Sequence, residues 1–331
     1  MTAATDSPDR RRVLITGGTG MIGRLLVEAL MESGDTSVVL VVRDEARARS
    51  LFSERAGCGR LSFVTGELGT GVVPEVSGRF DAIFHLASNT HPRAYAESPV
   101  ATIAMNVAAT QGLLEIAAAN KGCRFVYASS VEVYGQNRGD AEFFDEKYCG
   151  YIDCNTLRAG YPESKRCGEA LCQAYLKERG VDFVIVRLAR VYGPTLRKDD
   201  TKALSQFLRN AVEGRDIILK SAGEQCFSYL HVADAVDAIL AVWRKGACGE
   251  AYNAADESSD IKLKDLAALV AGHVGRKVVF DLPDAVEAAG FSTATLAKMS
   301  GAKLKALGWK PVYDIRSGIA ATIDALKERW L

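Results

Sequence analysis

The chain has 331 residues, 48% of them hydrophobic, and its 41 Lys and Arg residues are balanced by 41 Asp and Glu residues. This neutral balance argues against a nucleic-acid or membrane-surface partner, and the length predicts two domains or one large domain with an appended lobe. No apolar run approaches the roughly 18 residues that a membrane span needs. Residues 1–10 read as a flexible polar tail without a signal-peptide core, so we expect a cytoplasmic protein.

The eight cysteines form no C-x-x-C pair, and neither they nor the four histidines have a spacing typical of zinc sites. Most of the cysteines fall in apolar or helical segments. We therefore expect reduced thiols and no bound metal.

The first structured stretch, VLITGGTGMIG at 13–23, is an apolar run that breaks into glycines and resumes as a helix. Gly17 can adopt the backbone angles of a tight turn, Gly20 leaves room for a pyrophosphate, and Gly23 lets the helix sit close against the sheet. The helix N-terminus offers unpaired N–H groups and the positive end of its dipole to phosphates. The spacing is G-x-x-G-x-x-G rather than G-x-G-x-x-G, yet the strand-then-helix context predicts a dinucleotide-binding turn.

Strands and helices alternate in the first part of the chain. We predict strands at 37–42, 61–65, 81–87, 124–129 and 182–188, and helices at 24–33, 44–52, 99–120 and 161–179. This alternation predicts an α/β fold built on a doubly wound parallel Rossmann sheet. Right-handed crossovers place the carboxyl ends of the strands, and therefore a ligand, at one edge of the sheet.

From residue 193 the rhythm changes. We predict helices at 202–213, 232–244, 263–274 and 315–327 and an extended segment at 216–220. The Rossmann domain is predicted to span 11–190, with 229–250 returning to it. The remaining 191–228 and 251–331 are predicted to form a smaller substrate-binding lobe that closes over the cleft.

Tyr161 and Lys165 lie four residues apart near the start of a predicted helix, and therefore on one helix face. Because an ammonium beside a phenol favours the phenolate, we expect a lowered pKa for Tyr161 and a role as general base. Ser130 ends a predicted strand at the ligand-binding edge and could share the substrate proton. The alternative for Tyr161 and Lys165 is an exposed helix pair without chemistry.

Glu132 follows Ser130 by two residues, so on an extended strand its side chain projects to the same side. From there it could act on the substrate as a second acid or base. The alternative is a solvated carboxylate at the entrance of a loop.

These segments, in this order, resemble the extended short-chain dehydrogenase/reductase family, in particular its nucleotide-sugar epimerases, dehydratases and decarboxylases. The resemblance covers nearly the whole chain. It includes HLAS at 85–88, NV at 106–107, RLARVYGP at 187–194 and YLHVAD at 229–234.

The resemblance implies NAD(P) as cofactor and Ser130, Tyr161 and Lys165 as the catalytic set, with Lys165 also holding the nicotinamide ribose. Glu132 completes the candidate catalytic residues. The candidate cofactor-binding residues are Gly17, Gly20, Met21, Ile22, Gly23, Arg43, Asp44, Glu67, Leu68, Leu86, Ala87, Ser88, Asn106, Tyr161, Lys165 and Val191.

Departures from the family pattern narrow the reaction. The dTDP-glucose 4,6-dehydratases carry an Asp-Glu pair where this chain has Val131 and Glu132, so the acid that protonates the leaving hydroxyl is missing. The Thr-Ser-Glu of the UDP-xylose synthases is closer to Ser130, Val131 and Glu132. Segments around Tyr95, Pro99 and 158–165 are also similar to those enzymes.

A second departure concerns Phe227, which aligns with an Arg of these relatives. That Arg serves decarboxylation in the UDP-xylose synthases and holds the substrate diphosphate in epimerases. Arg190, Arg197, Lys198 or Lys220 could replace it, although solvated surface charge is the simpler interpretation of each.

The choice of cofactor depends on the residues after the second strand. Arg43 could clamp the 2′-phosphate of NADP. An acidic residue at this strand end would instead bind the adenosine ribose of NAD, but Asp44 could simply cap its helix. We therefore predict NADP in preference to NAD.

These observations predict an NAD(P)-dependent nucleotide-sugar epimerase, in which Tyr161 takes a hydroxyl proton while the C4 hydride passes to the nicotinamide. The alternatives are an NADPH-dependent ketoreductase and a decarboxylase or dehydratase of nucleotide sugars. A non-catalytic NAD(P)-binding regulatory protein is a third, against which the intact Ser-Tyr-Lys set argues. Apolar residues on more than one face of helices 99–120 and 161–179 predict a homodimer held by an intermolecular four-helix bundle, as the resemblance also implies.

Overall fold

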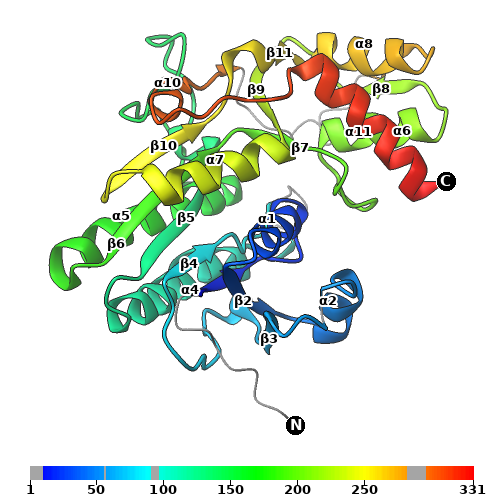
Figure 1. The fold of residues 1–331 in the computed structure, drawn as a ribbon. Coiled ribbons are helices and arrows are strands. Elements are labelled where there is room, and N and C mark those ends of the chain that lie inside the picture. Colours follow the sequence, from blue (N-terminus) through cyan, green and yellow to red (C-terminus); the bar gives the residue numbers. More distant parts are fainter. Residues whose placement is uncertain (1–9, 56, 91–96, 282–295) are drawn as a thin grey trace.

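The computed structural model describes residues 10–55, 57–90, 97–281 and 296–331. Within these residues the chain forms a large α/β sheet domain and a smaller lobe beside it (Figure 1). The segment around Tyr95 that resembles the UDP-xylose synthases lies outside the described residues, as does most of the predicted N-terminal tail.

The large domain is a sheet of seven strands in the order β10-β6-β5-β4-β1-β2-β3, and each neighbouring pair is parallel. The strands are β1 (Arg11–Thr16), β2 (Thr36–Val42), β3 (Leu61–Thr65), β4 (Ala82–His85), β5 (Arg124–Ser130), β6 (Asp182–Leu188) and β10 (Glu250–Ala254). The apolar runs of β1, β2, β4, β5 and β6 are buried on both faces, as parallel strands between two helix layers require, whereas the edge strand β3 is only partly buried. The predicted Rossmann-like fold is confirmed.

Alternate residues of β1 separate the two layers. Val13 and Ile15 pack with the helices of one face, α1 (Met21–Glu32) and α7 (Val232–Lys245). Leu14 packs with those of the other face, which are α4 (Pro99–Ala119) and α5 (Gly160–Arg179). The short helix α2 (Glu45–Leu51) follows β2.

Helix α4 is long and apolar enough, by length and composition, to cross a membrane. The expectation that no apolar run approaches the length of a membrane span does not hold for this helix. Met105, Ala109 and Leu113 of this helix are buried in the core against the sheet. This packing accounts for much of its apolar composition.

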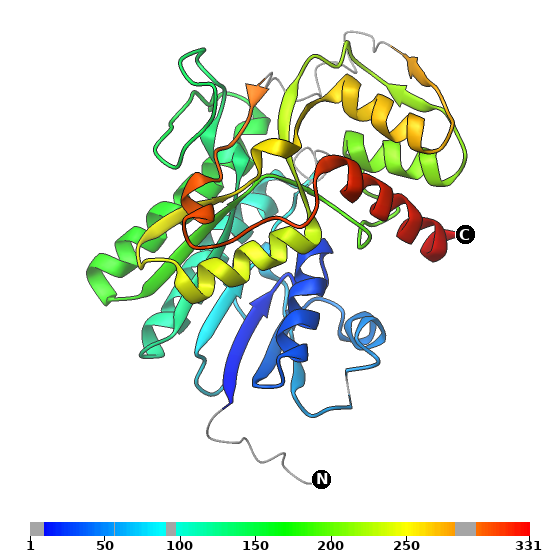
Figure 2. The same cartoon turned by 45° about the horizontal axis from the view of Figure 1, so that its top comes forward.

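The lobe contains two small sheets, one in the order β11-β9-β13, with β7 also paired to β9, and one of β12 and β8. These strands are β7 (Arg190–Tyr192), β8 (Ile217–Leu219), β9 (Cys226–His231), β11 (Asp260–Lys262), β12 (Val278–Phe280) and β13 (Leu296–Ala297). The helices are α6 (Ala203–Val212), α8 (Leu263–His273), α10 (Ala302–Lys305) and α11 (Ile315–Trp330). Figure 2 shows the lobe beyond the end of the sheet at which α1 begins.

The segment that returns from the lobe to the large domain comprises α7 and β10, and therefore runs over 232–254 rather than 229–250. Strand β9 belongs to the lobe because it pairs with β7, β11 and β13. Strand β10 belongs to the large sheet because Glu250–Ala254 pairs in register with β6.

All eight cysteines are free thiols.

Candidate active site

The glycine turn joins β1 to α1 in a conformation that side chains would obstruct. Gly17 has a φ of +74°, and a Cβ there would lie 2.7 Å from the backbone nitrogen of Ala87. A Cβ at Gly23 would come within 2.2 Å of the carbonyl oxygen of Gly17, so Gly23 lets α1 approach the turn rather than the sheet. A Cβ at Gly20 would have one close neighbour, the same carbonyl oxygen at 3.2 Å. The N-cap residue of α1 is Gly20, which has no side chain to cap the helix, so the first-turn amides are left for a ligand.

A buried histidine holds the strand ends around this turn. The Nδ1 atom of His85 lies 2.7 Å from Oγ1 of Thr16, and its Nε2 atom lies 3.0 Å from Oγ1 of Thr110. The amide of Ala87 donates to the Thr16 hydroxyl over 3.3 Å. Burial lowers the pKa of His85 to about 3, so the ring is neutral and serves as a structural connector.

A cavity of about 710 Å³ extends from the glycine turn across the ends of the central strands and into the lobe. Its wall includes every candidate catalytic or cofactor-binding residue predicted from the sequence except Asp44 and Asn106. A volume of this size is typical of sites for small molecules and cofactors.

The two excluded residues have structural roles next to the wall. Asp44 caps α2, where its carboxylate accepts the backbone N–H of Arg47 over 2.9 Å, and Arg43 alone of the pair lines the cavity. Asn106 is fully buried, accepts a 2.8 Å hydrogen bond from Ser88 and donates to Ser164 over 2.9 Å. It therefore positions the cavity residue Ser88 from behind.

Ser130 and Tyr161 meet at the floor of the cavity. Ser130 ends β5 and Tyr161 opens α5, and a hydrogen bond joins the two side chains. Burial raises the pKa of Tyr161 to about 12; the bond with Ser130 and the charge of Arg158 oppose this rise, and Glu132 adds to it. The predicted lowering of the Tyr161 pKa is therefore wrong for the protein without ligand, because the loss of solvent outweighs these two opposing contributions.

Lys165 lies one helical turn from Tyr161 but its ammonium is directed elsewhere. Its Nζ atom donates to the carbonyl oxygen of Ala128 over 2.8 Å and lies 4.7 Å from the centre of the Tyr127 ring. Burial lowers the pKa of Lys165 to about 7, although the nearby Glu169 acts in the opposite direction. The lysine lines the cavity and is only 2% exposed, so a ligand ribose would meet a desolvated amine.

Glu132 is not on an extended strand, as the sequence analysis assumed. After Ser130 the chain turns into a 3₁₀ turn, η2 (Val131–Tyr134), and the Ser130 hydroxyl accepts the amide of Glu132 over 3.3 Å. The Glu132 carboxylate accepts two hydrogen bonds from Nη2 of Arg158, each of 3.2 Å. Both residues line the cavity, so the carboxylate is an ion-pair partner at the reaction site rather than a solvated group.

A second ion pair, which sequence reasoning missed, supports the floor from below. Glu169 accepts a 2.6 Å hydrogen bond from Ser129 and forms a 2.6 Å ion pair with Arg187. The side chains of Glu169 and Arg187 are largely buried. Arg187 also donates to the hydroxyl of Tyr134 over 3.0 Å. The signal in the sequence was an acidic residue on the inner face of helix 161–179, four residues after Lys165.

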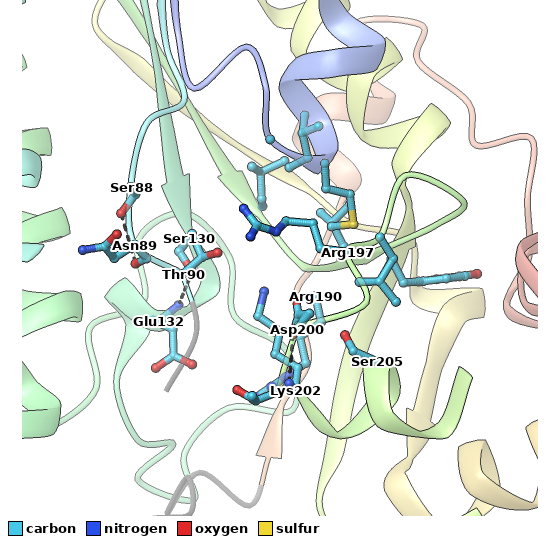
Figure 3. Close-up of a pocket in the computed structure, with 18 of the residues that line it drawn as sticks. Ser88, Asn89, Thr90, Ser130, Glu132, Arg190, Arg197, Asp200, Lys202 and Ser205 are labelled. Atoms are coloured by element: carbon cyan, nitrogen blue, oxygen red, sulfur yellow. Dashed lines mark hydrogen bonds between the residues drawn. The ribbon is translucent and has the colours of Figure 1, made fainter. Parts of the chain in front are cut away.

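The opposite wall of the cavity is cationic. Figure 3 shows Ser88, Ser130 and Glu132 on one side, and Arg190, Arg197, Asp200 and Lys202 facing them. Arg197 is engaged by Asp199 at 2.6 Å, and Lys198, which is not part of the wall, reaches the carbonyl oxygen of Trp330. Lys202 was not predicted as a site residue, because its neighbours in space come from distant segments.

Arg190 is the residue of this wall that contacts Phe227, the position at which the relatives carry an arginine. Its guanidinium lies over the ring of Phe227, 3.8 Å from the ring centre. Its Nε atom is buried, and no hydrogen-bond partner for it is found among the described residues. The interpretation of Arg190 as solvated surface charge is therefore wrong.

The model of the NAD-dependent epimerase/dehydratase family matches residues 13–255, which contain the glycine turn, both candidate catalytic segments and nearly all of the large sheet. The chain belongs to this family. It is accordingly an enzyme of the extended short-chain dehydrogenase/reductase type.

Several individual proteins are similar to the chain in sequence or in fold. The chain is 29% identical to UDP-glucuronic acid decarboxylase 1 of Xenopus tropicalis over 97% of this chain and 73% of that protein. A solved UDP-galactose 4-epimerase is 27% identical, with a TM-score of 0.76 over 97% of this chain and 100% of that one. UDP-glucuronic acid 4-epimerase from Bacillus cereus, solved with UDP-glucuronic acid and NAD, is 20% identical, with a TM-score of 0.80 over 96% of this chain and 100% of that one.

Proposed function

We propose that this enzyme epimerises a nucleotide-activated sugar through transient oxidation of one carbinol carbon. The observation that carries the proposal is the Ser130 and Tyr161 pair, with Glu132 and Arg158 beside it, on the wall that also contains the glycine turn. The same cavity continues to a cationic wall in the lobe, where an anionic nucleotide substrate would find charge of the opposite sign.

The geometry of the glycine turn fits a dinucleotide. Gly20 is open to the cavity, and the uncapped amides of α1 would hold the pyrophosphate, with Arg43 at the adenosine end and Lys165 at the ribose of the nicotinamide. Bound there, the dinucleotide would supply a hydride acceptor at its nicotinamide ring.

The remaining steps belong to the side chains of this enzyme. The Tyr161 oxygen accepts the proton of the substrate hydroxyl as the C–H bond of the same carbon breaks, and the Ser130 hydroxyl stabilises the oxygen that becomes a carbonyl. The ketone then rotates within the cavity, so that its other face is presented for reduction. Tyr161 would return the proton to the carbonyl oxygen as the other face of the ketone is reduced, which would give an alcohol of opposite configuration. Because the carbon that loses a hydride regains one, no net redox change would result.

The test is to incubate the enzyme with UDP-glucuronic acid, UDP-glucose, UDP-galactose, UDP-N-acetylglucosamine and dTDP-glucose in deuterated water and to follow the sugars by NMR. An epimer formed without added NAD(P)H and without loss of CO₂ supports the proposal. Net consumption of NADPH would indicate the ketoreductase instead. Deuterium on carbon that disappears in Glu132→Gln would assign proton abstraction to this carboxylate, and its absence from the unmodified enzyme would leave Glu132 without that role.

Decarboxylation of a uronic acid is the second candidate, because UDP-glucuronic acid decarboxylases are similar over nearly the whole chain. Phe227 argues against it, since the arginine that the resemblance associates with decarboxylation is absent from this position. If the enzyme released CO₂ from UDP-glucuronic acid and formed a UDP-pentose, its function would be decarboxylation rather than epimerisation.

For the cofactor we propose NADP in preference to NAD. Arg43 is exposed on the cavity wall, and Asp44, the acidic residue that follows it in the chain, is already used as the cap of α2. A 2′-phosphate there would contact the Arg43 guanidinium, and the Asp44 carboxylate, which caps α2, would not be available to bind the ribose of NAD instead.

For the assembly we propose a homodimer through α4 and α5. The outward side of α4 carries Val100 and Ile103, which are 79% and 43% exposed, and Ala170 and Ala174 are exposed on α5. A second copy related by a two-fold axis would cover these residues with the same pair of helices.

A further inference from the structure

Two neighbouring strands of the lobe place Arg190 and Phe227 against each other. Strand β7 pairs with β9 so that Arg190 is in register with Tyr229. Phe227 lies two residues from Tyr229 and therefore points to the same face of the strand pair. The guanidinium of Arg190 rests on the Phe227 ring at 3.8 Å from its centre, an arrangement that fixes the plane of the guanidinium.

The hydrogen-bonding capacity of Arg190 is not used up within the described protein. Its Nε atom is buried without a partner in this part of the chain, and the residue lines the cavity. An arginine is always charged, and a buried donor of a charged group without an acceptor costs free energy. The site therefore favours an acceptor that arrives with a ligand.

Two carboxylates of the cavity wall already have partners of their own. Glu132 is held by Arg158, and Asp200 accepts the backbone amide of Lys202 over 2.9 Å. Lys202 faces the same group of charges: burial lowers its pKa, Asp200 and Glu132 oppose that change, and Arg190 adds to it. Because the charge of Arg190 disfavours the ammonium form of Lys202, an anion placed between the two cations is favoured.

We propose that Arg190, supported by Phe227 and accompanied by Lys202, binds the diphosphate of the substrate. The guanidinium thus comes from β7, whereas the related enzymes are expected to supply it from the position of Phe227 on β9. This inference rests on the proposed function, because it takes a nucleoside diphosphate as part of the substrate.

The test measures binding of UDP, dTDP, GDP and ADP, and of the matching nucleosides, by calorimetry on the enzyme with its retained cofactor. A free diphosphate carries no sugar, so a uronic acid carboxylate cannot account for the result. Arg190→Gln is expected to weaken the best diphosphate by about ten- to a hundredfold and to leave its nucleoside unchanged. Arg190→Lys should fall between, because it keeps the charge and loses the planar fork.

Lys198→Gln is the matched control, because Lys198 is a neighbouring cation outside the cavity wall, and it should leave diphosphate binding unchanged. The double variant Arg190→Gln with Phe227→Arg should recover affinity, since it returns the guanidinium from the adjacent strand. Thermal unfolding and cofactor content show whether each variant is folded.

Equal diphosphate affinity in Arg190→Gln and the unmodified enzyme would overturn the inference, and so would an equal loss for diphosphate and nucleoside. If the unmodified enzyme binds none of the four diphosphates, both the inference and the proposed function fail. If Arg190→Gln loses diphosphate binding but no nucleotide sugar is epimerised, the proposed function fails and the diphosphate site stands.

Discussion

Nη2 of Arg158 donates hydrogen bonds to both carboxylate oxygens of Glu132, 3.2 Å to each, directly beside the hydroxyl of Tyr161. The two charges act on the phenol in opposite directions, Glu132 raising its pKa and Arg158 lowering it. The ion pair therefore keeps a carboxylate near the candidate general base, Tyr161, with much of its effect on the pKa of that phenol compensated.

This relationship predicts opposite pH shifts for the two partners. Arg158→Gln leaves the Glu132 charge uncompensated and so raises the pKa of Tyr161. The pH at which kcat rises should therefore be higher by about one pH unit. Glu132→Gln should move it down. Profiles of kcat against pH for both variants check the signs, with Arg138→Gln, an exposed arginine outside the cavity, as the control. A shift in the same direction for both variants would contradict the interpretation.

Tyr161→Phe should abolish proton transfer and leave the site otherwise intact. The substitution removes the hydroxyl that pairs with Ser130 but keeps a ring that is only 5% exposed. Loss of a general base lowers the rate by about a hundredfold to ten-thousandfold. Single-turnover hydride transfer measures the loss, and cofactor released on denaturation should match the unmodified enzyme. Tyr151→Phe, on an exposed tyrosine outside the cavity wall, should change neither quantity.

Arg43→Ala should weaken NADP binding by about ten- to a hundredfold and NAD binding far less, because only NADP presents a 2′-phosphate to the guanidinium. Fluorescence titration with the two reduced cofactors provides both dissociation constants. Arg47→Ala, on the exposed face of α2 and outside the cavity wall, is the control. Equal losses for NADP and NAD in Arg43→Ala would mean that the arginine supports structure and that NAD is the natural cofactor.

The depressed pKa of Lys165 predicts a pH-dependent stability of the cofactor-free protein. The folded pKa is about 7 and the ordinary value is 10.5, so between them the unfolded chain binds more protons than the folded one. The contribution of Lys165 to the free energy of unfolding therefore rises as the pH rises through this window, and its cost is full below it. Relative to Lys165→Met, the unmodified protein should gain stability from pH 7 to about pH 9 in urea unfolding. Lys177→Met, an exposed lysine of α5, should show no such gain, and a difference for Lys165→Met that does not change with pH would refute the prediction.

The proposed homodimer predicts that one charge on the outer side of α4 separates the copies. The unmodified enzyme should scatter light as a dimer at micromolar concentration, and Ile103→Glu as a monomer, because the carboxylate would be buried without a partner. Val279→Glu places the same charge on a similarly exposed residue of the lobe and should remain dimeric. A monomeric unmodified enzyme would end the proposal.

Local patterns were sufficient for six of the seven strands of the large sheet, for the glycine turn and for the helix that carries Tyr161 and Lys165. Strand β10 was not predicted. Alternation of strand and helix, and a spacing of four residues, are properties of neighbours in the chain, and the chain geometry converts them directly into faces and edges. For the same reason the sequence identified Asp44 as the cap of α2, which the structure confirms.

The lobe and the charges of the site required the tertiary structure. Arg190 meets Phe227 through the register of β7 on β9, and Glu132 meets Arg158 across 26 positions of sequence, distances at which no local periodicity operates. The direction of the Tyr161 pKa was also out of reach, because burial determines it and burial depends on everything packed above the residue. The sequence by itself thus determined the glycine turn and six strands of the sheet, whereas only the tertiary structure placed β10 and decided which charges face one another across the cavity.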